Sequence, residues 1–128
     1  MPVNILFLDD SEDLREVVAL LLQSNLGEKC LCVESVDELK TVAKQALNCR
    51  LIILDINLGS DKPTGLDAYD WLRENGFKGK INFLTGHARA HPLVIKASKK
   101  GAGVWSKPFS TDEFCQSVAE ILKTEAAI

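Results

Sequence analysis

The sequence lacks the features that mark several large classes of protein. Its apolar runs span only a few residues each, far short of the roughly 20 that a membrane helix needs, and no basic leader or cleavage site precedes the first of them. The net charge of the 128 residues is only -3, and Lys and Arg are scattered among acidic residues, so no strong field favours nucleic acid or anionic lipid. We therefore expect a cytoplasmic protein that binds neither membranes nor nucleic acid directly.

Cysteine is also scarce, with four residues in the chain. Cys30 and Cys32 share an apolar run, whereas Cys49 and Cys115 stand alone. No C-x-x-C pair occurs and no His lies near any of them, so neither a disulfide scaffold nor a zinc motif is indicated. We interpret them as buried thiols, with a redox or zinc role as the alternative.

Five short apolar runs alternate with helical patterns along the chain. The runs predict strands at 3–8, 30–34, 51–54, 81–84 and 103–106. Strands that alternate with helices imply right-handed crossovers and a parallel sheet covered on both faces. We therefore predict a single α/β domain over residues 1–128 with a doubly wound parallel sheet.

Local signals place the helices between these strands. The first helix is predicted to bury one apolar stripe, made of Leu14, Val17, Val18, Leu21 and Leu22. Capping boxes open two others, Ser35 with Glu38 and Ser110 with Glu113. The Ser35 helix should turn these residues inward: Leu39, Val42, Ala43, Ala46 and Leu47. The remaining helices are predicted at 66–75 and 91–100.

Polar residues follow four of the predicted strands. Asp9 and Asp10 follow the first, Asp55 the third, Thr85 the fourth and Lys107 the fifth. Because the carboxyl ends of parallel strands meet at one edge of a sheet, these side chains should converge. Carboxylates ~4 Å apart repel by about 1 kcal/mol in water and about 4 kcal/mol at an effective dielectric of 20, so the cluster needs a cation. Mg2+ fits, because it prefers oxygen ligands and bridges carboxylates to phosphate.

These residue types suit phosphoryl transfer to an aspartate. Asp55 stands alone after the most apolar strand and is the candidate nucleophile, because aspartyl phosphates are established covalent intermediates. Asp9 and Asp10 would hold metal, while the Thr85 hydroxyl and the Lys107 ammonium would contact phosphoryl oxygens. Each residue alone also has a structural interpretation as a helix cap, a strand end or a solvated lysine. Their joint placement favours the site.

The chain resembles, at these positions, the receiver domain of two-component response regulators, the chemotaxis-type phosphoacceptor family. The shared motifs, in the family's order, are Leu8-Asp9-Asp10, Leu54-Asp55, Leu84-Thr85-Gly86, Gly101-Ala102-Gly103 and Lys107-Pro108-Phe109. The resemblance implies a flavodoxin-like sheet of five strands in the order 2-1-3-4-5, with helices on both faces. It also implies a cis Lys107-Pro108 bond.

The resemblance further implies a chemistry and its partners. Asp55 would accept a phosphoryl group from a sensor histidine kinase or a histidine phosphotransfer protein, and the switched surface would bind a downstream protein. Asp10, Asp55 and the backbone carbonyl of Asn57 would ligate Mg2+ directly, with Asp9 acting mainly through water. The receiver would catalyse its own phosphorylation and dephosphorylation without turning over small substrates.

Three positions depart from the family's usual pattern. Val104 stands where an aromatic residue often changes rotamer with phosphorylation, and Trp105 lies beside it. Since a β-branched side chain has few rotamers, output is expected to depend on the backbone after Thr85. The loop at 57–65 is about two residues longer than the family norm by the spacing to the following helix. Asn57 and His87 occupy the positions that in this family tune the access of water to the phosphoryl group. Because a histidine can titrate near neutral pH, the phosphoryl lifetime could depend on pH. An exposed loop histidine without such a role is the simpler interpretation.

Two alternatives stay open from the sequence. A degenerate receiver would act by protein binding only, although its acidic pair, Asp55, Thr85 and Lys107 are all present. A haloacid-dehalogenase-like phosphatase would need D-x-D after the first strand, where this chain has Asp9-Asp10-Ser11. No output domain is recognised in the chain. By resemblance, the output surface lies on the fourth and fifth helices with Val104 and Trp105, and the first helix faces the kinase with Leu14 and Arg15.

Overall fold

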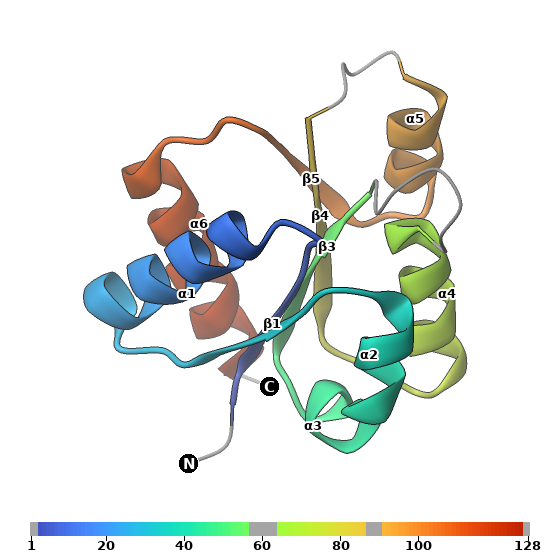
Figure 1. Ribbon diagram of the computed structural model, residues 1–128, viewed down its shortest axis with the longest axis horizontal. Coiled ribbons are helices and arrows are strands. Elements are labelled where there is room, and N and C mark those ends of the chain that lie inside the picture. Colours follow the sequence, from blue (N-terminus) through green and yellow to red (C-terminus); the bar gives the residue numbers. More distant parts are fainter. Residues whose placement is uncertain (1–2, 57–63, 87–90, 127–128) are drawn as a thin grey trace.

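The computed structural model describes residues 3–56, 64–86 and 91–126, and these form three layers with a sheet between two sets of helices (Figure 1). The strands are β1 (Ile5–Leu8), β2 (Cys30–Val33), β3 (Leu51–Asp55), β4 (Lys80–Thr85) and β5 (Gly103–Ser106). All neighbouring pairs are parallel, and the order is β2-β1-β3-β4-β5. The predicted doubly wound, flavodoxin-like arrangement is confirmed.

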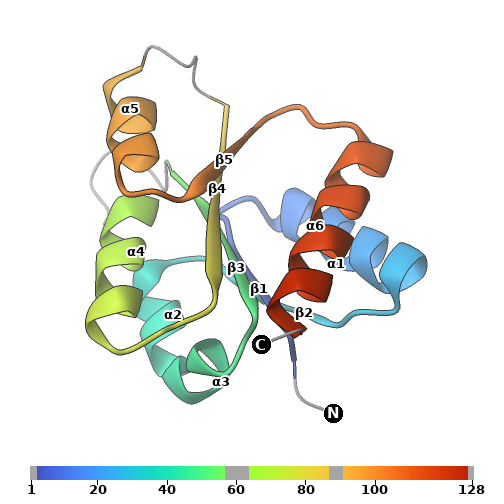
Figure 2. The same cartoon turned by 180° about the vertical axis from the view of Figure 1, so that it is seen from behind.

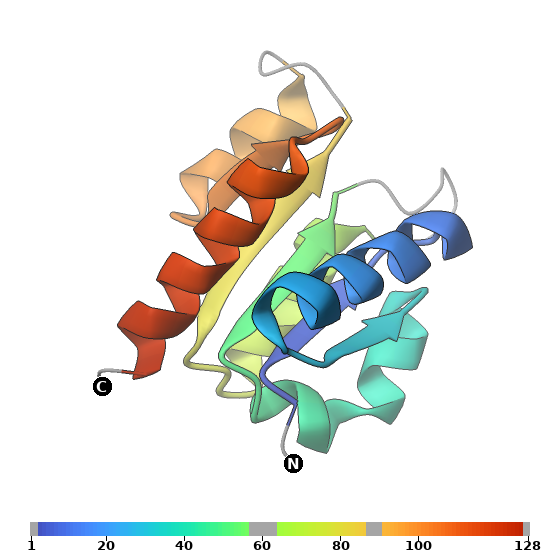
Figure 3. The same cartoon turned by 90° about the vertical axis from the view of Figure 1, so that its left-hand side faces the viewer.

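The helices cover both faces of the sheet. On one face lie α1 (Glu12–Leu26) and α6 (Thr111–Ala126), which run side by side in Figure 3. The other face carries α2 (Val36–Thr41), α3 (Ala43–Leu47), α4 (Gly65–Glu74) and α5 (Pro92–Lys99), as the reverse view in Figure 2 also shows. None of the helices in the described ranges is long and apolar enough to cross a bilayer.

The central strands are apolar because they are buried on both sides. Side chains that alternate along β1 and β3 enter two separate clusters. The cluster under α2 to α5 takes Leu6, Leu8, Ile52 and Leu54, all with no exposed area. The cluster under α1 and α6 takes Ile5, Phe7, Leu51 and Ile53, which are equally buried.

Strand register brings the carboxyl ends of four strands to one edge. Leu8 is level with Leu54, Asp55 with Leu84, and Thr85 with Ser106. The residue that follows each strand therefore lies beside its neighbours, although up to 98 positions separate them in the chain.

The stripe predicted for α1 is wrong at Val17. Val18 and Leu22 are buried and Leu14 and Leu21 pack against the core, but Val17 is 48% exposed. At about 100° per residue, Val17 falls at the border of the arc that faces the sheet. It belongs to the solvent side of the helix, together with Leu20, which is 66% exposed.

The helix predicted after Ser35 is divided into α2 and α3. Val42 leaves the helical region at φ -113 and ψ 29, and its N–H binds the Leu39 carbonyl, three residues back. The Thr41 hydroxyl donates to the Glu38 carbonyl at 2.6 Å. Such side-chain bonds compete with the helical ladder. The Ser35 cap itself forms, at 3.0 Å from Oγ to the Glu38 N–H, while the Glu38 carboxylate accepts from Glu34 rather than from Ser35.

Candidate functional site

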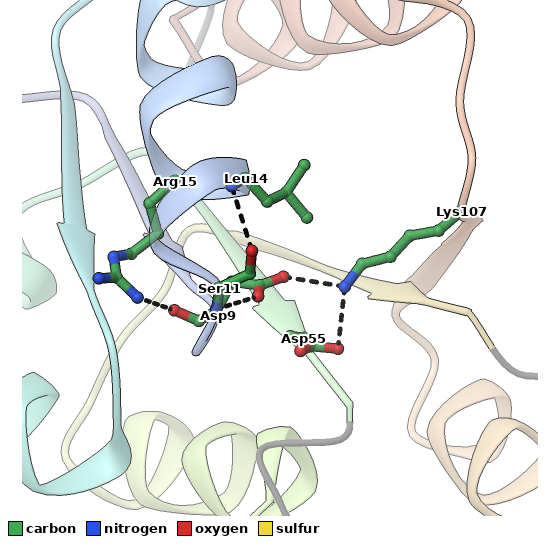
Figure 4. A network of polar contacts seen from close by, with 6 residues as sticks. All are labelled: Asp9, Ser11, Leu14, Arg15, Asp55 and Lys107. Carbon is green, nitrogen blue, oxygen red and sulfur yellow. Dashed lines mark hydrogen bonds and ion pairs between the residues drawn. The ribbon is translucent and has the colours of Figure 1, made fainter.

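The polar residues predicted from the strand ends meet at the carboxyl edge of the sheet, and Figure 4 shows three of them, Asp9, Asp55 and Lys107. Asp9, Asp10 and Asp55 each offer an oxygen, and these oxygens lie within 4.8 Å of one another. The Lys107 Nζ lies 2.9 Å from Asp9 Oδ2 and 3.5 Å from Asp55 Oδ1. The convergence predicted from the sequence is therefore present.

Asp9 is fully buried and held from several directions. Its carboxylate accepts from the Ser11 N–H at 2.9 Å and from Lys107. Its carbonyl accepts from Arg15 Nη1 at 2.7 Å, and its own N–H donates to Val33 at the end of β2. A buried carboxylate is stable only when paired and hydrogen-bonded, and both conditions are met here.

Asp10, in contrast, is exposed at the beginning of α1. The Ser11 side chain caps this helix by accepting from the Leu14 N–H at 3.2 Å. Either Asp10 or Ser11 could have capped the helix from the sequence, and the cap is Ser11, which leaves the Asp10 carboxylate to the acidic cluster. Its carboxylate lies at the open side of the acidic cluster, where an incoming ion would meet it.

Asp55 ends β3 with 4% of its surface exposed. Gly65 at the beginning of α4 lies against it, so closely that a Cβ at this position would overlap the Asp55 carbonyl oxygen. The Gly65 N–H also donates to the carbonyl of Ile56 at 3.2 Å. Glycine at position 65 therefore allows α4 to begin beside the strand end that carries Asp55.

Thr85 and Lys107 are joined through the backbone. The Lys107 N–H donates to the Thr85 carbonyl at 2.7 Å, which carries the pairing of β4 and β5 one residue past the strand. Thr85 is buried, and the Lys107 side chain is about a quarter exposed. The Lys107-Pro108 bond is cis, as predicted.

The donor set suits a divalent cation. Three carboxylates and one ammonium leave a formal charge of -2 at this edge, which a doubly charged ion would balance. All of the ligand atoms are hard oxygens, as Mg2+ requires.

Some predicted site residues cannot be compared with the structure. Asn57, His87 and most of the loop at 57–65 lie outside the described residues. The Asn57 carbonyl ligand, the tuning of hydrolysis by Asn57 and His87, and the longer loop stay predictions.

Val104 and Trp105 are half-buried on opposite faces of β5. Val104 packs against the cluster under α4 and α5, level with Phe83, on which Tyr69 of α4 stacks at 5.7 Å between ring centroids. Trp105 meets Phe114 of α6 edge-on at 5.3 Å. The predicted fourth and fifth helices are α5 and α6, so Val104 points to the α5 side of edge strand β5 and Trp105 points to its α6 side.

The sequence did not indicate the Arg15 contact with Asp9. Arg15 lies one turn into α1 and reaches back to the Asp9 carbonyl, as Figure 4 shows. No spacing rule predicts a side-chain bond to a loop carbonyl. The role of Gly65 was also missed, although a glycine directly after the long loop is visible in the sequence.

Known proteins agree with this architecture. The Response regulator receiver domain family model matches residues 5–119. Response regulator protein TodT from Pseudomonas putida is 33% identical over 121 residues, which cover 93% of this chain and 51% of TodT. The chain thus spans about half the length of the curated relatives that it first matches.

Solved structures give the same result. The receiver domain of NtrX from Brucella abortus superposes with a TM-score of 0.79 at 27% identity, covering 94% of this chain and 98% of that chain. A response regulator receiver domain protein from Clostridium thermocellum, at 22% identity, shares the fold with a TM-score of 0.81, covering 98% and 99% of the two chains. With the family model matching most of its length, this chain belongs to the response regulator receiver domain family of two-component signalling.

Proposed function

We propose that Asp55 accepts a phosphoryl group, in a Mg2+-dependent reaction, from a sensor histidine kinase or a histidine phosphotransfer protein. The observation that carries this proposal is the position of Lys107, whose Nζ lies 2.9 Å from buried Asp9 and 3.5 Å from buried Asp55. One cation shared by two carboxylates holds Asp55 at the edge of the sheet, where a nucleophile must lie. Membership of the receiver family supports phosphoryl acceptance as the general function.

In the proposed step an Asp55 carboxylate oxygen attacks phosphorus. The new O–P bond forms as the P–N bond of phosphohistidine breaks, and the released imidazole nitrogen takes a proton from solvent. Charge on the transferred group spreads over three equatorial oxygens. The Lys107 ammonium would neutralise one of these oxygens. Thr85, which ends the strand next to β3, would donate a hydrogen bond from its hydroxyl to another. Attack by water on the same phosphorus later releases phosphate and restores the carboxylate.

The metal would be held by Asp10 and Asp55 directly, with the Asn57 carbonyl as a third ligand and Asp9 acting through water. When bound, Mg2+ supplies the positive charge that carboxylate and phosphoryl oxygens need to approach each other. The formal charge of -2 at the edge supports this assignment.

The proposed switch acts on protein partners in the cytoplasm. We place the receiver unit over residues 1–128, so that output comes from a separate protein or from a segment outside this sequence. The kinase-facing surface is the beginning of α1, with Leu14 and Arg15, and exposed Val17 and Leu20 extend it. The output surface is α5 with β5 and α6. Family membership argues against the phosphatase alternative.

Intact mass after incubation with acetyl phosphate and Mg2+ tests the proposal. The protein should gain one phosphoryl group, and the adduct should disappear in Asp55→Asn and in the presence of chelator. Asp70→Asn is the matched control, because Asp70 is an aspartate of α4 that pairs with Lys100 away from the edge. An adduct that survives in Asp55→Asn would place the phosphoryl group elsewhere, and no adduct at all would indicate a degenerate receiver.

The switch at Val104 has its own test. Because a valine has few rotamers, Val104→Ala should preserve the response to phosphorylation, which we assign to the backbone at Thr85 and Gly86. In a Trp71→Phe background, where Trp105 is the one remaining tryptophan, the change in fluorescence on adding beryllium fluoride, a phosphoryl analogue, reports that response. Its complete loss in Val104→Ala would contradict the assignment.

A further inference from the structure

The edge strand β2 carries two thiols on one face. Cys30 and Cys32 flank Leu31, so both side chains point toward α1 while Leu31 points to the opposite cluster. Their Sγ atoms are 3.9 Å apart, and both residues are partly exposed. In contrast, Cys49 and Cys115 are buried, and no thiol contact links either of them to another cysteine in the described ranges.

The spacing of these sulfurs does not fit a disulfide. Residues i and i+2 of a strand have Cα atoms about 6.6 Å apart, at the upper limit for a disulfide. The sulfurs would also have to approach from 3.9 Å to the S–S bond length of about 2.05 Å. Closing the bond would require both side chains to leave their present positions at the upper limit of the allowed Cα separation, in a strand that is paired along its whole length with β1.

The same spacing fits two ligands of one metal ion. Zinc binds thiolate sulfur at about 2.3 Å, so two thiolates at a tetrahedral angle lie about 3.8 Å apart. The observed 3.9 Å matches this value without any movement of the backbone. β2 is an edge strand and both residues are partly exposed, while their side chains also pack against the cluster under α1 and α6.

We propose that Cys30 and Cys32 form a second metal site, a dithiolate that binds one thiophilic divalent ion of the zinc and cadmium class. Two thiol protons pass to solvent, two metal–sulfur bonds form, and no oxidation state changes. Water completes the coordination. Soft thiolates select such ions, whereas the hard carboxylates of Asp9, Asp10 and Asp55 select Mg2+, so the two sites are chemically distinct.

The sites are close, and the test must separate them. Cys32 Sγ lies 3.6 Å from the Arg15 carbonyl, and the Arg15 side chain binds the Asp9 carbonyl. The probe is therefore Cd2+ added in the presence of excess Mg2+, which occupies the carboxylates. The readout is the sulfur-to-cadmium charge-transfer absorption in the ultraviolet, to which carboxylate ligands do not contribute.

The wild-type protein should show this absorption and saturate at one Cd2+ per chain. Cys30→Ser and Cys32→Ser should each lose it, while Cys49→Ser and Cys115→Ser should keep it. The control thiols are suitable because each stands alone, with no contact to another cysteine thiol in the described ranges, whereas the Sγ atoms of Cys30 and Cys32 lie 3.9 Å apart. No absorption in the wild type, or absorption retained in Cys30→Ser or Cys32→Ser, would overturn the proposal.

A second measurement does not depend on the folding of variants. Alkylation of the wild-type protein is followed by peptide mass spectrometry with and without one equivalent of Cd2+. Protection confined to Cys30 and Cys32 is expected. Equal modification of these two residues in both samples would contradict the site. Phosphorylation of Asp55 enters neither measurement, so the result is independent of the proposed function.

Discussion

The sheet buries polar side chains in two places, and these differ in their surroundings. At the carboxyl edge, Asp9, Asp55 and Thr85 are buried together beside Lys107. In the middle of β4, Asn82 is equally buried at 4% exposure, but its Oδ1 has no hydrogen-bond partner among the described residues. The edge therefore compensates its buried polar groups, whereas the interior leaves one of them uncompensated.

The buried polar groups at the edge belong to the candidate site, whereas the buried amide of Asn82 affects only how β4 and β5 pack. The Asp9 carboxylate is stabilised by the Lys107 ammonium and the Ser11 N–H, in a cluster whose third member, Asp10, is exposed. Asn82 instead lies level with Gly103 of β5, and a Cβ on Gly103 would come within 2.8 Å of Asn82 Oδ1. A buried polar atom without a partner costs about 1–3 kcal/mol. The Asn82 amide fits because Gly103 has no side chain at this position.

Replacing Lys107 removes the compensation at the edge and should have the largest effect. In Lys107→Met, phosphorylation by acetyl phosphate should slow by about 100-fold, because the transferred group loses a positioned cation. Mg2+ binding should not weaken, since a positive charge beside the acidic cluster is gone. Intact mass over time measures the first effect and calorimetric titration the second. Lys99→Met, at an exposed position of α5, is the matched control, and equal rates in the two variants would contradict the role of Lys107.

A methyl group added at position 103 tests whether the buried Asn82 side chain restricts the residue opposite it on β5. Gly103→Ala should lower the free energy of unfolding by about 1–3 kcal/mol, because overpacking forces Asn82 to shift. Urea denaturation measures the loss. With Asn82→Ala in the same chain the added methyl has room, so the double-mutant cycle should show favourable coupling. Strictly additive effects would mean that Asn82 does not restrict position 103.

Replacing Asp10, the exposed member of the acidic cluster, tests whether the three carboxylates repel one another when no metal is bound. Asp10→Asn should weaken Mg2+ binding at least about tenfold, because even in water a unit charge ~4 Å away is worth about 1 kcal/mol and the ion carries two charges. Without metal, the same variant should be slightly more stable to urea, since one of three like charges is lost. Asp13→Asn is the control, three residues further along in the first turn of α1 but outside the cluster. Weaker Mg2+ binding together with higher stability to urea would confirm the prediction, and a loss of both would contradict it.

The smallest effect is expected when the uncompensated interior amide is replaced. Asn82→Leu, which has a similar shape, should raise the free energy of unfolding by about 1 kcal/mol by removing the unpartnered oxygen. Phosphorylation should be unchanged, because Asn82 lies three residues before Thr85 in the strand. A fall in stability measured by urea denaturation would show that the amide has a partner that stabilises it.

Much of this edge was predictable from the sequence because each polar residue follows an apolar run. Asp9, Asp10, Asp55, Thr85 and Lys107 could be placed together once the strands were taken as parallel. The sequence could not show that Asp9 is buried while Asp10 is exposed, because that depends on the direction in which the chain leaves β1. The interruption at Val42 was missed for a similar reason, since the apolar pattern continues across it.

The ion pair between Lys107 and Asp9 joins residues 98 positions apart. These residues follow β5 and β1, and β3 and β4 lie between those strands in the sheet. Contacts of such long sequence separation close a large loop and form only when the intervening elements are in place. The cation shared by Asp9 and Asp55 therefore arrives only when β5 has joined the sheet. Under the proposed function, the site that accepts the phosphoryl group would therefore be complete only in the fully folded chain.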